Sequence, residues 1–179
     1  MAQIDSLFQT LESLQAQKKL PPVGQWHPER VGAIDIRIDR DGTWYHEGAA
    51  FQRHALVKLF ATVLRKDPDG YYLVTPAEKL RIEVADAPFL GIDLDIRGAG
   101  EGAELLFTTN MDDYVVADAE HPLRVTEHQG EPRPYLMVRD GLDALISRPV
   151  FYRLVDHATQ EDDQLVVYSR GTRFPLGRI

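Results

Sequence analysis

Cysteine is absent from this chain of 179 residues, and its absence excludes several kinds of chemistry. Without cysteine the protein has no disulfide, no catalytic thiolate and no zinc site built on thiolates. Long apolar runs are also missing, because no stretch approaches the roughly 20 residues that a membrane-spanning helix needs. The first residues lack the basic start and the apolar segment of a signal peptide. These features predict a cytoplasmic protein with no membrane partner.

Basic residues are fewer than acidic ones: the chain has 20 Lys or Arg and 28 Asp or Glu, which gives a formal net charge of −8. Neutralising the phosphates of a long nucleic acid needs an excess of Lys and Arg, so we expect no long nucleic acid as a partner. A single nucleotide held in a local basic pocket remains compatible with this composition. Hydrophobic residues make up 44% of the chain, which predicts a globular fold with one large or two small cores.

Nucleotide and metal motifs are missing too. The glycines of "GAGEG" at 98–102 lack the GxGxxG spacing and precede β-type residues, so they predict a turn. The chain has no P-loop, HExxH or GxSxG motif, and its six histidines show no paired ligand spacing. We therefore expect no catalytic residues, no metal and no cofactor. The plentiful acids leave a carboxylate-using hydrolase or nucleotide-processing enzyme as the alternative.

Alternation of apolar and polar residues predicts strands along most of the chain. Ile34, Ile36 and Ile38 alternate with Asp35 and Arg37, and the Asp-Gly pair that follows predicts a hairpin turn. Because strands cluster rather than alternate with helices, we expect an α+β fold with mostly antiparallel sheets. The other expected strands cover residues 71–76, 79–85, 92–96, 103–110, 113–118, 123–128, 150–158 and 164–171.

Helical spacing is confined to three segments. In the first, Leu7, Leu11 and Leu14 share a face, Ser6 and Gln9 resemble a capping box, and the prolines that follow end the helix. We expect this helix to dock on the body of the protein, with pairing of two chains as the alternative. For the protein as a whole, a second copy of the chain and a signalling protein are the protein partners considered. The three expected helices cover residues 6–17, 51–67 and 140–148, of which the second is the strongest.

Two pairs of segments suggest an internal repeat. The sequences "YYLVTPAEKLRIEV" at 71–84 and "PYLMVRDGLDALIS" at 134–147 share an aromatic residue, a leucine, a nearby valine and an apolar-spaced end. The hairpin sequences around Gly42 and Gly171 both contain a Gly-Thr pair with an aromatic residue close behind it, Trp44 directly after the first pair and Phe174 one residue beyond the second. A duplication explains these similarities, and so do unrelated hairpins, because Gly-Thr-aromatic is ordinary turn chemistry.

The run from Ile34 to Phe89, the segment "TTNMDD", residues 134–156 and the closing "SRGTRFPLG" resemble the proteobacterial domain-of-unknown-function family numbered 1285. The resemblance spans roughly residues 20–179 and leaves only the first helix outside. It implies a duplicated two-domain fold whose C-terminal half looks superficially like a pleckstrin-homology domain. It also implies a signalling role and a nucleic-acid-like ligand bound at the surface between the domains.

These inferences give three expected parts: a helix and linker over 1–21, an N-terminal α+β domain over 22–88 and a C-terminal α+β domain over 89–179. The protein is expected to be a ligand-binding or adaptor protein that takes a nucleotide-like anion between the domains. Guanidinium groups bind phosphate, and hydroxyl and amide groups complete its hydrogen bonds. The candidate contacts at strand ends and in family-like stretches are Thr75, Glu78, Lys79, Thr109, Asn110, Arg139 and Arg148.

Each candidate also has an ordinary structural interpretation. Thr75 suits the start of a turn, Glu78 and Lys79 suit a solvated surface, and Asn110 suits a left-handed turn position. Trp44 follows the Asp-Gly turn beside the strongest helix, so we expect it to be buried by packing rather than exposed for base stacking.

Overall fold

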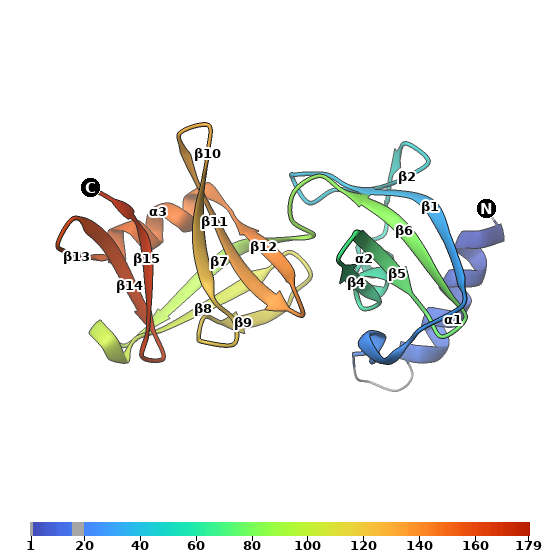
Figure 1. Cartoon of the computed structure of the whole chain (residues 1–179), viewed down its shortest axis with the longest axis horizontal. Coiled ribbons are helices and arrows are strands. Elements are labelled where there is room, and N and C mark those ends of the chain that lie inside the picture. The colour runs from blue at the N-terminus through green and yellow to red at the C-terminus, as the bar shows by residue number, and fades with distance from the viewer. Residues whose placement is uncertain (1, 16–19) are drawn as a thin grey trace. The chain divides into compact units, whose positions relative to one another are not determined.

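The structure is a computed structural model that describes residues 2–15 and 20–179. The chain divides into two compact units, Met1–Asp86 (unit 1) and Ala87–Ile179 (unit 2), shown in blue to green and in green to red in Figure 1. Within the described residues, no helix combines the length and the hydropathy that crossing a membrane requires.

Unit 1 contains a six-stranded sheet with the order β3-β2-β1-β6-β5-β4. The central strands β1 and β6 are parallel, and the other neighbouring strands are antiparallel. The strands are β1 (Arg30–Ile38), β2 (Trp44–His46), β3 (Ala49–Ala50), β4 (Leu64–Asp67), β5 (Gly70–Val74) and β6 (Glu78–Val84). The helices are α1 (Ala2–Gln15), the 3-10 helix η1 (Val23–Gln25) and α2 (His54–Ala61).

One face of the unit 1 sheet forms the core. The predicted alternation is confirmed, because Ile34, Ile36 and Ile38 are buried while the residues between them are exposed. Leu7 of α1 is buried as well, and α1 contacts α2. Trp44 is 2% exposed and pairs with Ile38 across β1 and β2, so the prediction that it is a packing residue is confirmed.

Unit 2 repeats this arrangement. Its six-stranded sheet has the order β10-β11-β12-β7-β8-β9, again with a parallel pair, β7 and β12, at the centre. The strands are β7 (Phe89–Arg97), β8 (Glu104–Thr109), β9 (Tyr114–Val116), β10 (Leu123–His128), β11 (Glu131–Arg139) and β12 (Leu142–Ile146), and a 3-10 helix η2 (Gly100–Gly102) follows β7. The predicted fold class, two related α+β units with mostly antiparallel sheets and a short N-terminal helix, is confirmed.

The strand register aligns the two units residue by residue. Leu64, Leu73 and Leu80 form a buried row across β4, β5 and β6. The equivalent buried row across β10, β11 and β12 consists of Leu123, Leu136 and Ala144. On the opposite face, Arg65 pairs with Tyr72 as Arg124 pairs with Tyr135. The tyrosine-leucine match between the two segments of the suspected sequence repeat therefore coincides with the structural one.

A further segment follows the repeated part in unit 2. Helix α3 (Arg148–His157) buries Val150, Phe151 and Leu154. It leads into a three-stranded antiparallel sheet with the order β13-β14-β15. These strands are β13 (Thr159–Glu161), β14 (Gln164–Ser169) and β15 (Thr172–Arg178).

Four predicted elements differ from the structure. The helix expected over 51–67 ends at Ala61, and Leu64–Asp67 is strand β4. The helix expected over 140–148 is wrong, because Leu142–Ile146 is strand β12, which buries alternate residues. The strand expected over 150–158 is wrong as well, since these residues belong to α3. The first helix begins at Ala2, so Ser6 lies inside it rather than at its start, and residues 16 and 17 lie outside the described part.

The two Gly-Thr hairpins are different turns. In the turn between β1 and β2, Gly42 has a φ of +84°, and the N–H of Asp39 donates to the carbonyl of Thr43. In the turn between β14 and β15, both Arg170 and Gly171 have positive φ, at +48° and +77°, as a two-residue hairpin of type I′ requires. The second turn lies in the sheet that has no counterpart in unit 1, so these hairpins are not copies of each other.

We predict that Trp44→Ala lowers the free energy of unfolding by about 3–5 kcal/mol, because it leaves a cavity in the core of unit 1. Urea denaturation followed by circular dichroism measures the loss. Tyr45→Ala is the matched control, since Tyr45 is half-buried on the other face, and we expect it to cost about 1 kcal/mol. A loss below about 1 kcal/mol for Trp44→Ala would contradict its role in packing.

Candidate functional site

The seven candidate residues are divided between the two units. Thr75, Glu78 and Lys79 lie at the hairpin between β5 and β6 in unit 1. The other four, Thr109, Asn110, Arg139 and Arg148, lie in unit 2.

The two threonines stabilise turns. Thr75 is 2% exposed, and its Oγ1 accepts hydrogen bonds from the backbone N–H groups of Ala77 at 3.3 Å and Glu78 at 3.2 Å. Thr109 is fully buried, and its Oγ1 accepts from two backbone N–H groups of the β8–β9 loop, both at 3.2 Å. Their hydroxyl oxygens are therefore used inside the protein, which agrees with the structural interpretation of Thr75.

Asn110 extends the pairing of β7. Its Oδ1 accepts from the N–H of Leu90 at 3.0 Å, and its own N–H donates to the carbonyl of Leu90 at 3.0 Å. The left-handed position of this loop belongs to Asp112, with a φ of +63°, so the expectation that Asn110 holds it is wrong.

Arg139 is a mostly buried cation at the end of β11. Its side chain is 19% exposed, its Nη1 lies 3.6 Å from Asp113, and its guanidinium lies 5.2 Å from the ring centre of Phe89. Burial lowers the pKa of Arg139 below its usual value, while Asp113 and Asp140 oppose that shift. Because Arg139 packs on a buried ring, we expect its removal to disturb the fold of unit 2 rather than to leave it intact.

Arg148 lies at the other end of β11. Its Nη2 donates to Glu131 at 2.7 Å, and both side chains are more than half exposed. Since β11 runs from Glu131 to Arg139, its length separates the two arginines by about 25 Å at roughly 3.3 Å per residue. The structure therefore does not bring Arg139 and Arg148 to one phosphate.

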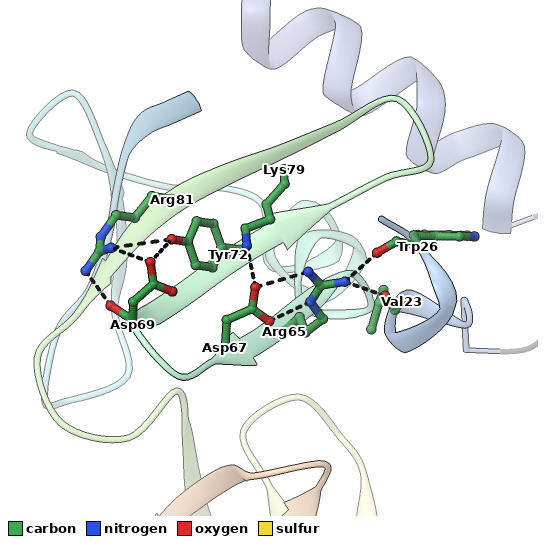
Figure 2. Close-up of polar contacts among 8 residues, drawn as sticks. All are labelled: Val23, Trp26, Arg65, Asp67, Asp69, Tyr72, Lys79 and Arg81. Carbon is green, nitrogen blue, oxygen red and sulfur yellow. Dashed lines mark hydrogen bonds and ion pairs between the residues drawn. The ribbon is translucent and has the colours of Figure 1, made fainter. Parts of the chain in front are cut away.

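Lys79 belongs to a network of charged side chains on the outer face of the unit 1 sheet, shown in Figure 2. Arg65 donates to both carboxylate oxygens of Asp67, from Nε at 2.8 Å and from Nη2 at 3.1 Å. The Nζ of Lys79 donates to Oδ2 of the same carboxylate at 2.5 Å. Arg65 also donates from Nη1 to the carbonyls of Val23 and Trp26, at 2.7 and 2.8 Å, which ties η1 to the edge strand β4.

Tyr72 lies between two cations in this network. The Nζ of Lys79 is 4.1 Å and the guanidinium carbon of Arg81 is 5.8 Å from the centre of its ring. Its hydroxyl donates to Asp69 at 2.8 Å, and Arg81 donates to that hydroxyl at 3.4 Å (Figure 2). We call Arg65, Asp67, Asp69, Tyr72, Lys79 and Arg81 the basic sheet cluster.

Asp67 is held in its ionised form. The hydrogen bond from Arg65 is the largest cause that lowers the pKa of Asp67 below 3.8, and Lys79 lowers it further, while burial acts in the opposite direction. A carboxyl group with a lowered pKa is a poor general acid, which needs its proton at neutral pH. The arrangement is therefore better suited to binding than to proton transfer.

Unit 2 has the same scaffold with a different charge. Arg124 lies 4.8 Å above the ring of Tyr135 and donates to Asp143 at 2.8 Å. Asp143 occupies the position of Lys79 in the repeat. Lys79 lies on β6 just before Leu80, and Asp143 lies on β12 just before Ala144, the residue that the register aligns with Leu80. The second cation on this face is therefore particular to unit 1.

The whole chain has a matching charge asymmetry. Residues 1–86 contain 11 Lys or Arg and 12 Asp or Glu, whereas residues 87–179 contain 9 and 16. All five lysines precede residue 87. An anion is therefore repelled less by unit 1 than by unit 2.

Sequence reasoning found Lys79 but missed the rest of the basic sheet cluster. Arg65 and Asp67 were assigned to a helix, and a helical assignment does not place them opposite Tyr72 and Arg81. The alternating residues of 78–84 contained the available signal, because they place Lys79 and Arg81 on one face. Among the residues that the structure describes, no group of three or more His, Asp or Glu side chains is arranged to hold a metal ion.

Comparison with known proteins identifies relatives for both units. Residues 21–87 match the family model described as "Domain of unknown function (DUF1285), N-terminal domain", and residues 88–176 match "Protein of unknown function (DUF1285), C-terminal domain". A crystal structure of a DUF1285 family protein from Silicibacter pomeroyi DSS-3 is 44% identical, has a TM-score of 0.87, and is matched over 90% of each chain. One from Shewanella baltica OS155 is 27% identical, with a TM-score of 0.55 over 69% of this chain and 92% of that one. No curated protein matches the chain.

We predict that Asp67→Asn lowers the free energy of unfolding at pH 7 by about 1–3 kcal/mol, since it leaves Arg65 and Lys79 without their shared carboxylate. Because the pKa of Asp67 is lowered in the folded protein, its stabilisation is present above pH 3.8 and is lost as the pH falls through the folded-state pKa. The difference between the two proteins should therefore shrink below about pH 4.

Denaturation at a series of pH values measures this difference. Asp95→Asn is the control, because Asp95 is 63% exposed and its ion pair with Arg97 is 3.4 Å long. We expect it to cost less than about 0.5 kcal/mol. A cost for Asp67→Asn that is equally small, or that stays constant down to low pH, would show that the carboxylate does not stabilise the fold.

Proposed function

The chain belongs to the DUF1285 family, and we propose that it is a non-catalytic binding protein that holds a small, nucleotide-like anion on the basic sheet cluster of unit 1. The placement of Lys79 and Arg81 carries the proposal. These two cations lie on the same face of β6, with Tyr72 between them on the neighbouring strand.

The chemistry of the two cations suits a phosphate group. Arg81 is 51% exposed, and its guanidinium plane allows two parallel hydrogen bonds to phosphate oxygens. Lys79 is 19% exposed and contributes a compact positive charge next to it. Asp67 balances part of this charge in the absence of a ligand, so the anion competes with a carboxylate for Lys79.

The phosphate, rather than the base, is the expected point of recognition. Tyr72 is only 4% exposed, so its ring face is covered by protein and does not stack on a ligand. A site that recognises phosphate accepts several nucleotides with similar affinity, which suits an adaptor in signalling that responds to a class of ligand.

The carboxyl groups give the alternative enzyme hypothesis little support. Burial opposes ionisation of Asp41, Asp67, Asp93, Asp118 and Glu161, but hydrogen bonds and nearby charges outweigh it and lower the pKa of each of these five carboxyl groups. A hydrolase that uses two carboxylates needs one of them to keep a proton, and therefore a raised pKa. We therefore propose binding without catalysis.

We predict that Arg81→Gln weakens the binding of a nucleotide by roughly 10- to 100-fold, which corresponds to a lost charged hydrogen bond of about 1.5–3 kcal/mol. Lys79→Gln should weaken it to a similar extent, and added salt should weaken binding to the unchanged protein. Isothermal titration calorimetry with a panel of mono- and dinucleotides measures both effects.

Arg97→Gln provides the control for the loss of one positive charge. Arg97 is 69% exposed, pairs with an aspartate and lies in unit 2. If no nucleotide in the panel binds with a Kd below about 1 mM, or if Arg97→Gln weakens binding as much as Arg81→Gln does, the proposed site is wrong. Circular dichroism and thermal unfolding of each variant separate lost binding from lost structure.

A further inference from the structure

The two cations of β6 in the basic sheet cluster are each held by an acid of the β4–β5 hairpin. Asp67 ends β4, and Asp69 lies in the turn that follows it. The Nζ of Lys79 donates to Asp67 at 2.5 Å, and the Nη1 of Arg81 lies 3.6 Å from the carboxylate of Asp69 (Figure 2). An anion that binds Lys79 and Arg81 must therefore take them from two carboxylates of the chain itself.

Each of these carboxylates has a second partner that stays when its cation leaves. Asp67 accepts from the Nε and Nη2 of Arg65, at 2.8 and 3.1 Å. Asp69 accepts from the hydroxyl of Tyr72 at 2.8 Å. Because a polar group is costly mainly when it is left without any partner, the cations can change partners without a large loss to the fold.

Arg81 is also held in place by the backbone of the turn. Its Nη2 donates to the carbonyl of Asp69 at 2.7 Å. A Cβ atom at Gly70 would lie 2.8 Å from the same nitrogen, so the glycine leaves the space that the guanidinium fills. The hydrogen bonds of Arg81 to the described residues use two of its five N–H groups. The side chain is therefore oriented before an anion arrives and keeps donors for it.

The two carboxylates determine which anions can bind. Each carries one negative charge, and because both belong to the chain they compete at a high effective concentration. A free anion with a single charge offers the cations no stronger attraction than the aspartates do. A phosphate monoester has a second ionisation near about pH 6 and carries about two negative charges at pH 8, whereas a phosphate diester carries one. Attraction to the two cations rises with that charge.

We propose that the basic sheet cluster selects phosphate monoesters over phosphate diesters, with Asp67 and Asp69 as the residues that exclude singly charged anions. This preference rests on the proposed function, since it concerns the same site. A nucleoside 5′-monophosphate has the required terminal phosphate, whereas a cyclic nucleotide or an internal phosphate of a nucleic acid does not.

The test compares adenosine 5′-monophosphate with adenosine 3′,5′-cyclic monophosphate, which share the base and the sugar and differ in phosphate charge. Isothermal titration calorimetry on the full chain at pH 8 and low salt should show at least about tenfold tighter binding of the monoester. Ribose 5-phosphate has the same terminal phosphate without a base. It should bind within about threefold of the nucleotide, because the ring of Tyr72 is covered and offers no stacking surface.

Asp69→Asn removes one of the competing charges. Asp69 is 65% exposed, so we expect the variant to fold. It should bind adenosine 5′-monophosphate about three- to tenfold more tightly than the unchanged protein does. Glu83→Gln is the matched control, because it removes one negative charge from an exposed position of the same strand, while the ion pairs of Lys79 and Arg81 go to Asp67 and Asp69. We expect it to change the affinity by less than about twofold.

Three results would overturn the preference while leaving the proposed anion site in place. They are equal binding of the monoester and the cyclic diester, an Asp69→Asn variant that binds no more tightly than Glu83→Gln does, and a ribose 5-phosphate affinity more than about tenfold below that of the nucleotide. If neither the unchanged protein nor Asp69→Asn binds any of the three compounds with a Kd below about 1 mM, the proposed function is wrong and the preference is wrong with it.

Discussion

The parallel pairing of β1 with β6 is the constraint on which the rest of unit 1 depends. Parallel neighbours need a long crossover connection, and here everything from β2 to β5, including α2, forms that connection. The pairing joins two antiparallel ladders into one sheet, and it places β6 in the middle, with β1 on one side and β5 on the other. The basic sheet cluster lies beside this pair, since Lys79 and Arg81 come from β6 and Tyr72 from β5, which pairs with β6 in an antiparallel hairpin. The same constraint acts in unit 2 through β7 and β12.

Strands in which apolar and polar residues alternate strictly were predictable, because this pattern fits a strand with one buried face and one exposed face. Residues 123–128 and the isoleucines of β1 are examples in which the expected and observed elements coincide. Helices were less predictable where the spacing of apolar residues fits both a helix and a strand. The apolar spacing of α2 continues through Val63 and Leu64, although Thr62, whose hydroxyl donates to the carbonyl of Leu59 at 2.6 Å, already ends the helix. Residues 150–155 are rich in β-branched and aromatic types, yet Pro149 in the first turn and tertiary packing make them helical.

The candidate site was predictable only in part, since a site on a sheet depends on register across several strands. Thr75, Thr109 and Asn110 stand out in the sequence as polar residues at strand ends, and the structure uses each of them to bond its own backbone. Asp67 and Arg65 did not stand out, because their importance comes from Lys79, 12 residues beyond Asp67 in the chain. Family resemblance indicated the duplicated fold, but the charge at equivalent positions of the two copies, Lys79 and Asp143, differs, and only the register shows that they correspond.

The C-terminal segment of unit 2 has a consequence for the history of the protein. It consists of α3 and the sheet of β13, β14 and β15, all of which follow the last strand of the repeated sheet and have no counterpart in unit 1. A chain with only the two repeats would present β10 as a bare edge with nothing beside it. Because β15 lies beside β10, the added segment covers an edge that would otherwise invite aggregation. A repeated sheet that gained such a cover after its duplication could keep its edge strand unchanged.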